Sequence, residues 1–349
     1  MRRPAAASPT AAAATALMIL RPTHSRVIMP AAITGRDSTA RYSAMRGPTA
    51  AWRAAFVVDR EPRRRCDRHY RRLERAVLES YIGETAREIF RMARVFITGS
   101  ADGLGKMAAE LLIEQGHKVV LHARSAARAE ETRKKVGGAE HIVVGDLSNI
   151  AETKSVADLV NRLGWFDAVI HNAGIGYREP KLVKTVDGLP QLFAVNTLAP
   201  YLLTALITMP KRLVYLSSGM HYGAGSHLDD MLWEKRRWNG SQAYAETKFQ
   251  DVLLAFAVAR LFPEVKSNSL EPGWVPTKMG GAGAPDDIDK AHRTQVWLAT
   301  SDQPAAAVSG RYFFHQKLRD PDPATKDVER QDLLLDLCRK VSGIALSAT

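Results

Sequence analysis

Residues 94–105 have the sequence RVFITGSADGLG, and this stretch decides the fold. Four residues suited to a buried strand run into a glycine-rich turn. Beyond the turn, Leu104, Ala108 and Leu111 recur at the spacing of one helix face, and Gly116 stands where that helix would end. The sequence therefore predicts a strand, a tight turn and a helix in that order.

The glycines of this turn suit the binding of a phosphate group. Gly99 and Gly103 can adopt positive φ angles and allow a pyrophosphate to approach the backbone closely. The N-terminus of the following helix offers free amides and the positive end of a dipole. A strand-to-helix turn without a ligand has the same pattern, so the turn alone leaves both interpretations open.

A tyrosine and a lysine stand four residues apart much further along the chain, in Tyr244-Ala245-Glu246-Thr247-Lys248. Residues with this spacing share one face of a helix. A free phenol has a pKa of about 10, and a fixed cation beside it favours the phenolate and lowers that pKa. The pair indicates an acid/base device, although the same spacing also occurs by chance on solvated helix faces.

The glycine spacing and the Tyr-x-x-x-Lys pair together resemble the short-chain dehydrogenase/reductase family. Five further matches follow in the family's order: Asp146-Leu147, Asn172-Ala173-Gly174, Asn196, Ser217-Ser218, and Pro272-Gly273 with Thr277. The resemblance covers residues 92–349. It implies one α/β domain of the Rossmann type, with a doubly wound parallel sheet of about seven strands and helices on both faces. Within the single-domain branch, the motifs are most similar to bacterial proteins of the daunorubicin C-13 ketoreductase-like group, and next to retinol dehydrogenases.

The resemblance implies a catalytic role for four residues. Tyr244 would donate a proton to a carbonyl oxygen, and Ser218 would hydrogen-bond the same oxygen. Lys248 would lower the pKa of the phenol and hold the ribose hydroxyls of the cofactor. Asn196 would hold a water that connects Lys248 to solvent. Ser218 is chosen over Ser217 because the second serine of such a pair usually acts in this family.

The resemblance also implies a nicotinamide dinucleotide cofactor, whose type is decided at the end of the predicted strand 118–124. NAD requires an acidic residue there to hold the ribose diol. The sequence has Ala123 and then Arg124, which can grip a 2′-phosphate, so we expect NADPH/NADP rather than NADH/NAD. Asp102 argues the other way, because many NADPH-using relatives carry a basic residue at that position. The predicted cofactor-binding residues are Thr98, Gly99, Ser100, Asp102, Gly103, Leu104, Gly105, Arg124, Asp146, Leu147, Asn172, Ala173, Gly174, Tyr244, Lys248, Pro272, Gly273, Val275 and Thr277.

An insertion separates Ser218 from Tyr244, which lie 26 residues apart. The insertion and the segment after Gly273 carry five rings, at His221, Tyr222, Trp233, Trp238 and Trp274. Aromatic surface beside the catalytic groups predicts a bulky apolar ketone or aldehyde as substrate, but the same rings could instead pack the loop onto the domain. Residues 279–285 are glycine-rich and predict a flexible lid, or otherwise a plain surface turn.

Residues 1–91 differ in composition from the rest of the chain. They hold 18 Arg, no Lys and 8 acidic residues, so they account for +10 of the net charge of +12. Three interpretations stay open: a start codon assigned too far upstream of Met92, an Arg-rich targeting peptide, or a basic arm for nucleic acid or a partner. We expect most of this segment to be disordered, with an amphipathic helix between about residues 72 and 90 as a weaker expectation.

The two cysteines, Cys66 and Cys338, predict no disulfide framework and fit a reducing compartment. We therefore expect a cytoplasmic protein, with organellar targeting as the alternative. Cys338 lies in a leucine-rich stretch and suits a buried apolar position. The histidines lack the spacing of metal ligands, so no metal site is predicted.

Two competing functions remain beside an NADPH-dependent reductase. One is an NAD-dependent alcohol dehydrogenase of the same fold, and the other is a non-enzymatic redox sensor or scaffold. The intact Ser, Tyr and Lys set favours an enzyme. The expected partner is a small apolar carbonyl or alcohol substrate. We expect no nucleic acid partner for residues 92–349 and no transmembrane segment, while a homo-oligomer stays open.

Overall fold

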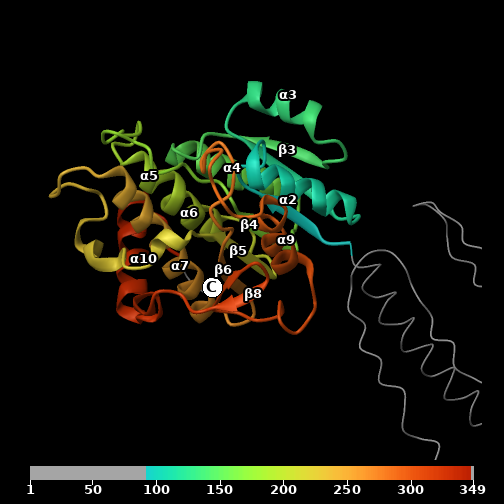
Figure 1. Ribbon diagram of the computed structural model, residues 1–349. Coiled ribbons are helices and arrows are strands. Elements are labelled where there is room, and N and C mark those ends of the chain that lie inside the picture. The colour runs from blue at the N-terminus through green and yellow to red at the C-terminus, as the bar shows by residue number, and fades with distance from the viewer. Residues whose placement is uncertain (1–91, 347–349) are drawn as a thin grey trace, which may run out of the picture. The chain divides into compact units, whose positions relative to one another are not determined.

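The computed structural model of this chain describes residues 92–346 (Figure 1). The predictions made for residues 1–91 therefore fall outside the described part of the chain. They concern the disorder of that segment, its helix near residues 72–90, its three interpretations and Cys66.

The described residues form one eight-stranded sheet with the strand order β3-β2-β1-β4-β5-β6-β7-β8. The strands are β1 Arg94–Ile97, β2 Lys118–Ala123, β3 His141–Val144, β4 Ala168–His171, β5 Arg212–Leu216, β6 Lys266–Glu271, β7 Arg311–Phe314 and β8 Lys317–Arg319. All pairings are parallel except that of β7 with β8. The chain reverses its direction of growth between β1 and β4, and ligands of such sheets bind at this point, beyond the carboxyl ends of the strands. The doubly wound fold predicted from the sequence is confirmed.

Helices cover both faces of the sheet. They are α2 Gly103–Glu114, α3 Ala126–Lys135, α4 Ile150–Arg162, α5 Gln191–Phe193, α6 Ala199–Leu206, α7 Gly240–Leu261, α8 Ile288–Ala291, α9 Arg293–Thr300 and α10 Val328–Ser342, with a π-helical turn η1 Ala194–Leu198 and short 3₁₀ turns η2 Gly219–His221, η3 Gly225–Asp230 and η4 Pro323–Lys326. In Figure 1, α2 and α9 lie on one side of the strands, and α5, α6 and α7 lie on the other. Successive residues of β1 serve the two faces, because Phe96 belongs to one hydrophobic core and Val95 and Ile97 to the other.

The sheet has one strand more than the seven or so that were predicted. The short strand β8 adds an antiparallel edge after a turn in which His315 and Gln316 take φ angles of 47° and 61°. Its three residues are exposed, and two of them are charged. A strand this short carries no recognisable alternation of apolar and polar residues, so the sequence pattern did not reveal it.

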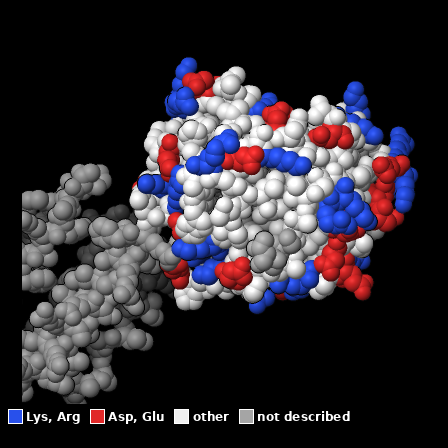
Figure 2. All heavy atoms as spheres, turned by 180° about the vertical axis from the view of Figure 1, so that it is seen from behind, with Lys and Arg blue, Asp and Glu red and all other residues white. Residues whose placement is uncertain are grey.

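Charged side chains are not gathered by sign on the one face that Figure 2 shows. On the face seen in Figure 2, basic and acidic groups lie intermixed around a broad uncharged area. Ion pairs also form between residues of the same helix, such as Lys106 with Glu110 on α2 and Arg133 with Glu130 on α3. This agrees with the near-neutral composition of residues 92–349, which carry only +2 of the chain's net charge of +12.

The helix α7 carries the predicted tyrosine and lysine through the interior. It begins at Asn239, whose side chain accepts a hydrogen bond from Gln242 N, and it continues for 22 residues. Its residues are buried almost without a break from Ala243 to Val258. A helix enclosed on all sides is apolar around its whole circumference, so the polar residues that it does contain stand out.

The first turn is packed too closely for a side chain at its last glycine. A Cβ atom built on Gly105 would lie 2.3 Å from Asn172 Nδ2 and 2.5 Å from the carbonyl oxygen of Gly99. Both neighbours are themselves held by hydrogen bonds between β1 and β4. Gly105 is therefore required for the close approach of α2 to the strand ends.

We expect Gly105→Ala to lower the free energy of unfolding by about 1–3 kcal/mol, because the added methyl group must push the start of α2 away from Asn172 and from the carbonyl oxygen of Gly99. Gly137→Ala is the matched control: its added Cβ would meet nothing within 4 Å, and its stability should be unchanged or slightly raised. Urea denaturation of the two variants measures the difference. Equal stabilities would show that the close packing at Gly105 is not needed.

Candidate active site

The turns after β1 and β4 are fastened to each other by side chains. Thr98 Oγ1 accepts hydrogen bonds from the backbone N–H groups of Asn172 and Ala173, both at 3.0 Å. Asn172 Nδ2 donates in return to the carbonyl oxygens of Thr98 and Gly99, at 3.0 and 3.1 Å. Two predicted cofactor motifs, Thr98-Gly99 and Asn172-Ala173-Gly174, thus lie side by side at the carboxyl edge of the sheet.

A histidine that the sequence analysis passed over holds the same turn from the other side. His122 Nδ1 accepts a hydrogen bond from Gly99 N at 3.0 Å, so Nε2 carries the proton and donates to the carbonyl oxygen of Gly145 at 2.9 Å. Burial lowers the pKa of His122 and keeps the ring neutral, as this arrangement requires. The sign of this role in the sequence was that His122 is a polar residue among the apolar residues of β2.

The glycine turn leaves room for a phosphate group. Gly103 has a φ angle of 51°, and a Cβ built there would meet no atom within 4 Å, so the space in front of the N-terminus of α2 is open. The amides of the first turn of a helix lack partners within the helix and can bind an anion. Open space and free amides at the switch point fit a dinucleotide pyrophosphate.

Asp102 is neutralised by cations from two distant segments. Its carboxylate caps α2 by accepting from Gly103 N, pairs with Lys278, and lies 3.5 Å from the guanidinium of Arg128. The hydrogen bond from Lys278 makes the largest contribution to a lowered pKa of Asp102. Lys278 directly follows the predicted cofactor residue Thr277, so this pair joins the glycine turn to the segment after β6.

The other predicted cofactor residues lie in the loops that follow β1, β2, β3 and β6. Arg124 lies exposed after the end of β2 and, within residues 92–346, makes no hydrogen bond or ion pair. Asp146 Oδ1 accepts from Ser148 N at 2.9 Å and shapes the loop after β3. Ser100 and Leu147 have buried side chains, so only their backbones can face a ligand. Gly273, with a φ angle of 90°, turns the chain after β6, next to Pro272 and before the buried Val275.

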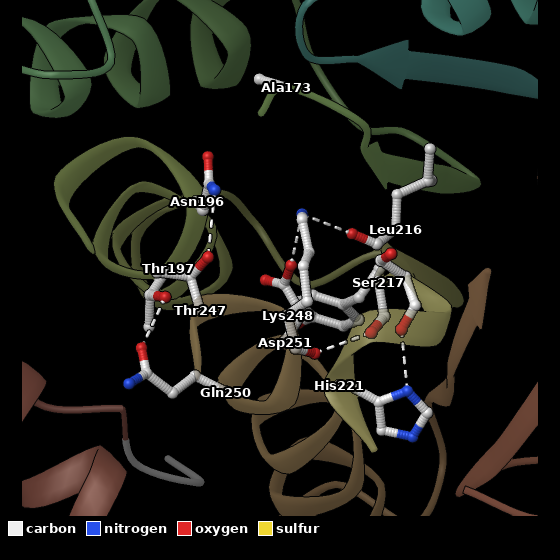
Figure 3. Close-up of polar contacts among 12 residues, drawn as sticks. Ala173, Asn196, Thr197, Leu216, Ser217, His221, Thr247, Lys248, Gln250 and Asp251 are labelled. Atoms are coloured by element: carbon white, nitrogen blue, oxygen red, sulfur yellow. Dashed lines mark hydrogen bonds and ion pairs between the residues drawn. The ribbon is translucent and has the colours of Figure 1, made fainter. Parts of the chain in front are cut away.

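The predicted catalytic residues come from α7, from the loop after β5 and from η1, and Figure 3 shows Lys248 and Asn196 among their surroundings. The side chain of Ser218 lies near the hydroxyl of Tyr244 and lowers the pKa of that phenol. The ammonium of Lys248 lies 5.8 Å from the centroid of the Tyr244 ring. Its Nζ donates to the carbonyl oxygen of Leu216 and to Asp251 Oδ2, both at 2.8 Å.

The electrostatic environment of Tyr244 holds opposing effects. Burial raises the pKa of its phenol, and it outweighs the lowering effects of the Lys248 ammonium and of the hydrogen bond with Ser218. Burial likewise disfavours the charged form of Lys248, but Asp251 and Tyr244 more than offset it and raise the pKa of Lys248. Lys248 is therefore a stable cation inside the protein. Asp251 was not singled out from the sequence, although it is an acidic residue in a buried helix.

The two adjacent serines have different roles in the structure. Ser217 Oγ donates to the carbonyl oxygen of Lys248 at 2.7 Å and ties β5 to α7. Ser218 Oγ accepts from Met220 N and meets the hydroxyl of Tyr244. Ser217 is thus engaged within the fold, and the catalytic role of Ser218 stays a prediction.

Asn196 lies in the π-helical turn η1 between α5 and α6. Its Oδ1 accepts from Ile175 N at 2.8 Å, and its Nδ2 donates to Thr247 Oγ1 at 3.0 Å. A Cβ built on Gly174 would lie 3.5 Å from both Asn196 Oδ1 and Lys248 Nζ. The absence of a side chain at Gly174 therefore leaves space between the amide and the ammonium, where the predicted water would lie. Single π-helical turns occur frequently at functional sites.

His221 is a structural residue of the loop after β5. Its Nδ1 donates to the carbonyl oxygen of Ser218 at 2.8 Å, and its Nε2 accepts from Asp322 N at 3.0 Å. Its ring lies between those of Tyr222 and Tyr312, with centroids 4.0 and 4.8 Å away. His221 thus fixes the backbone of Ser218 rather than facing a substrate. Tyr222 points away as well, because its hydroxyl donates to the carbonyl oxygen of Asp320.

Of the remaining aromatic residues, some pack close to Tyr244 and others hold the neighbouring segments in place. Tyr244 belongs to an apolar cluster with Leu192, Trp233 and Ala243, against which Ile175, Tyr177, Trp238 and Met279 pack. Tyr177, which the sequence analysis missed, meets the Tyr244 ring edge-on with the centroids 5.6 Å apart. Trp233 is buried and packs edge-on against Trp238. Trp274 is 56% exposed and donates from Nε1 to the carbonyl oxygen of Gly280.

The insertion is anchored to α7 by a buried ion-pair network. Arg236 donates to both carboxylate oxygens of Glu246, at 2.7 and 2.9 Å, and to Asp230 Oδ2 at 3.0 Å. Its guanidinium also lies 4.0 Å from the centroid of the Trp233 ring. Bidentate pairs of this kind fix geometry as well as charge. The flexibility predicted for residues 279–285 stays a prediction, although Met279 packs against Gly176 across the site.

His171, at the end of β4, is buried beside the site. Its ring stacks on that of Tyr215 at a centroid distance of 4.7 Å, and Nε2 lies 3.2 Å from Thr204 Oγ1. Thr204 Oγ1 also lies 2.7 Å from the Tyr215 hydroxyl. Burial lowers the pKa of His171 to about 3, so the ring is neutral in the folded protein.

Membrane spans and metal clusters are both absent from residues 92–346. No helix in this range is long and apolar enough to cross a membrane. No group of three or more His, Cys, Asp or Glu side chains there could hold a metal ion. Cys338 is fully buried in the core with a free thiol, as its leucine-rich surroundings predicted.

Comparison with known proteins places this geometry in one family. The family model described as short chain dehydrogenase matches residues 93–220. An uncharacterized oxidoreductase of Emericella nidulans is 46% identical over 259 residues, which cover 73% of this chain and 99% of that protein. Short-chain dehydrogenase chyC of Penicillium rubens is 41% identical over 261 residues, or 74% of this chain and 100% of that protein. A crystal structure from Mycobacterium paratuberculosis shares the fold, with a TM-score of 0.64 and 22% identity over 74% of this chain and 96% of that chain.

The two kinds of protein to which the motifs were most similar, daunorubicin C-13 ketoreductases and retinol dehydrogenases, are also found among the relatives. Retinol dehydrogenase 13 of Homo sapiens is 29% identical over 67% of this chain and 80% of that protein. A Streptomyces protein named as a daunorubicin C-13 ketoreductase, DnrU, is 28% identical over 67% of this chain and 86% of that protein. The family resemblance is confirmed, and the two fungal proteins are more similar to this chain than either of these.

We expect His171→Leu to weaken the pH dependence of stability. The pKa of His171 falls from 6.5 to about 3 on folding, so the unfolded chain binds a proton more readily. Stability is then fully present above about pH 6.5 and is lost as the pH falls toward 3, by about 1.4 kcal/mol per pH unit. Thr204 keeps Tyr215 as partner in the variant. Urea unfolding at neutral and mildly acidic pH measures both slopes, and equal slopes for wild type and variant would contradict the expectation.

Proposed function

The chain belongs to the short-chain dehydrogenase/reductase family of oxidoreductases acting on CH–OH and carbonyl groups, and we propose that it is an NADPH-dependent reductase of a bulky apolar ketone or aldehyde. One observation carries the proposal. The Tyr244 hydroxyl, near Ser218 and beside the Lys248 ammonium, lies at the sheet edge that also forms the glycine turn.

The side chains at this edge suit proton donation to a carbonyl. Bound NADPH supplies the hydride that reaches the carbonyl carbon. Tyr244 donates its hydroxyl proton to the carbonyl oxygen, and Ser218 hydrogen-bonds the same oxygen as negative charge develops on it. The Lys248 ammonium stabilises the phenolate that remains. Asn196 supports the return of a proton by holding a water in the space that Gly174 leaves beside Lys248.

The preference for NADPH rests on charge at the adenosine end of the crevice. Arg124 follows the end of β2 and is exposed without a partner in the described residues, so its guanidinium can take up a 2′-phosphate. Asp102 argued against this cofactor in the sequence. Its pairing with Lys278 and its closeness to Arg128 offset its charge, which supports NADPH over NADH.

The proposed substrate class rests on the wall beside Tyr244. Tyr177, Trp238, Ile175 and Met279 are partly buried and pack against the apolar cluster to which Tyr244 belongs, and the Tyr177 ring meets that of Tyr244 directly. A hydrophobic, ring-bearing carbonyl compound would bury such a surface well. A small polar aldehyde would leave these rings in contact with water.

We further propose that residues 92–349 form the catalytic domain. The match to the family model, residues 93–220, lies within this range, and so do Tyr244 and Lys248. A chain with only two cysteines fits a reducing compartment, so we propose the cytoplasm as the place of action.

Tyr244→Phe is expected to lower turnover by at least about 10² while leaving cofactor binding nearly intact, because the ring stays packed and the proton donor is lost. Tyr222→Phe is the control, since its hydroxyl bonds the backbone of Asp320 outside the catalytic set, and it should turn over normally. The loss of NADPH absorbance with aromatic and polycyclic ketones, retinal and small aldehydes measures the rates. Unchanged turnover in Tyr244→Phe would refute the mechanism.

Arg124→Ala is expected to remove a preference of roughly 10- to 150-fold for NADPH over NADH, the worth of one charge-assisted hydrogen bond. Arg133→Ala removes an equal charge from α3, where Arg133 pairs with Glu130, and should leave the preference unchanged. The ratio of kcat/KM with NADPH to kcat/KM with NADH, measured for the wild type and both variants, tests this expectation. A wild-type enzyme that favours NADH would instead support the NAD-dependent alcohol dehydrogenase.

A further inference from the structure

Asp251 is a buried carboxylate that none of the roles above employs. It lies on α7, one helical turn beyond Lys248, and the side chains of the two residues are 4% and 6% exposed. Asp251 Oδ2 lies 2.8 Å from Lys248 Nζ. A charged pair at this depth is costly to desolvate, so its presence beside a catalytic group calls for a physical account.

The ammonium of Lys248 is held between two acceptors (Figure 3). One is the carbonyl oxygen of Leu216, at the end of β5, and the other is the carboxylate of Asp251. An ammonium has three donors, so the third is left for the cofactor ribose or for the water beside Asn196. Without Asp251, one backbone carbonyl would be the sole described acceptor of this cation.

We propose that Asp251 is a positioning residue for the reaction, whose carboxylate balances the charge of Lys248 and holds the ammonium beside Tyr244. The inference rests on the proposed roles of Tyr244 and Lys248. Asp251 would act through Lys248 and would not touch the substrate.

The negative charge of Asp251 raises the pKa of both Tyr244 and Lys248. A negative charge makes it harder for any neighbouring group to lose a proton, and Asp251 contributes to raising the pKa of Tyr244 as well as that of Lys248. Burial raises the pKa of Asp251 itself to about 6, so the carboxylate is the form that faces Lys248 at neutral pH. Removal of this charge must therefore lower the pKa at which the Tyr244 and Lys248 pair loses its first proton.

Other titratable groups around Asp251 do not supply this charge. On β5, burial raises the pKa of Tyr215, and on β4, burial lowers that of His171, so both rings stay neutral. On the side of η2 and β7, His221 and Tyr312 lie near the two serines, and both are neutral because of burial. On β6, Glu271 is paired with Arg319.

The test is the pH profile of kcat/KM for carbonyl reduction in Asp251→Asn and Asp251→Leu. Reduction needs the protonated phenol, so activity falls at alkaline pH when the pair loses its proton. We expect this alkaline limb to move to lower pH by about one unit in both variants, which is about a tenfold loss at a pH above the limb. Either variant suffices if the other does not fold.

Gln250→Leu is the matched control. Gln250 is equally buried on the same helix and accepts a hydrogen bond from Thr197, away from Lys248. It should lose stability without moving the limb. If the Asp251 variants also lose stability and keep the wild-type limb, Asp251 is a structural residue only and the proposal is overturned.

A second measurement needs no substrate and separates this proposal from the proposed function. Asp251→Asn leaves a buried ammonium unpaired, whereas Lys248→Met/Asp251→Asn removes both charges, so the double variant should unfold at a higher temperature than the single one. This result would stand even if the wild type reduced no ketone or aldehyde, which would count against the proposed function alone. A double variant that is no more stable than Asp251→Asn would overturn the charge pairing.

Discussion

The cation of Lys248 is the group around which the interior of the site is arranged. A buried ammonium is tolerated only where acceptors surround it, and here they come from β5, through the carbonyl oxygen of Leu216, and from the same helix, through Asp251. The third direction is kept open by Gly174, because a Cβ atom at that position would lie 3.5 Å from the nitrogen. The end of β5, the helix α7 and the loop after β4 thus all contribute to the environment of this one ammonium.

The crevice for the dinucleotide follows from a second set of constraints, in which side chains satisfy backbone groups. Thr98 and Asn172 join the loops after β1 and β4, and His122 reaches the N–H of Gly99 from β2. Because these bonds hold the turn in place from three strands, its outward amides need no ligand to stay ordered. A site prepared in this way loses little conformational freedom when a phosphate binds.

The sequence was sufficient where a local pattern fixes the structure and insufficient where a partner lies elsewhere in the chain. The strand, turn and helix of residues 94–114 were predictable because glycine spacing and helical periodicity are local. His122 was missed because it is a lone polar residue in an apolar run, and Asp251 because it is one of several polar residues in the middle of α7. Neither pattern indicates which group the side chain will meet. Tyr177 was missed because nothing along the chain indicates that its ring faces Tyr244.

The two walls beside Tyr244 are built differently, and this bears on how a substrate would be selected. The insertion is held to α7 by the pairing of Arg236 with Glu246, two residues from Tyr244, so Trp238 stands on a fixed support. Met279, which packs against the same cluster, stands on a glycine-rich segment and has an unbranched side chain that adapts to irregular shapes. A rigid aromatic wall restricts the plane in which a flat substrate can lie, whereas a pliable wall tolerates variation in its size. Under the proposed function, selection would then depend on the shape of the substrate beside Trp238 and be more permissive beside Met279.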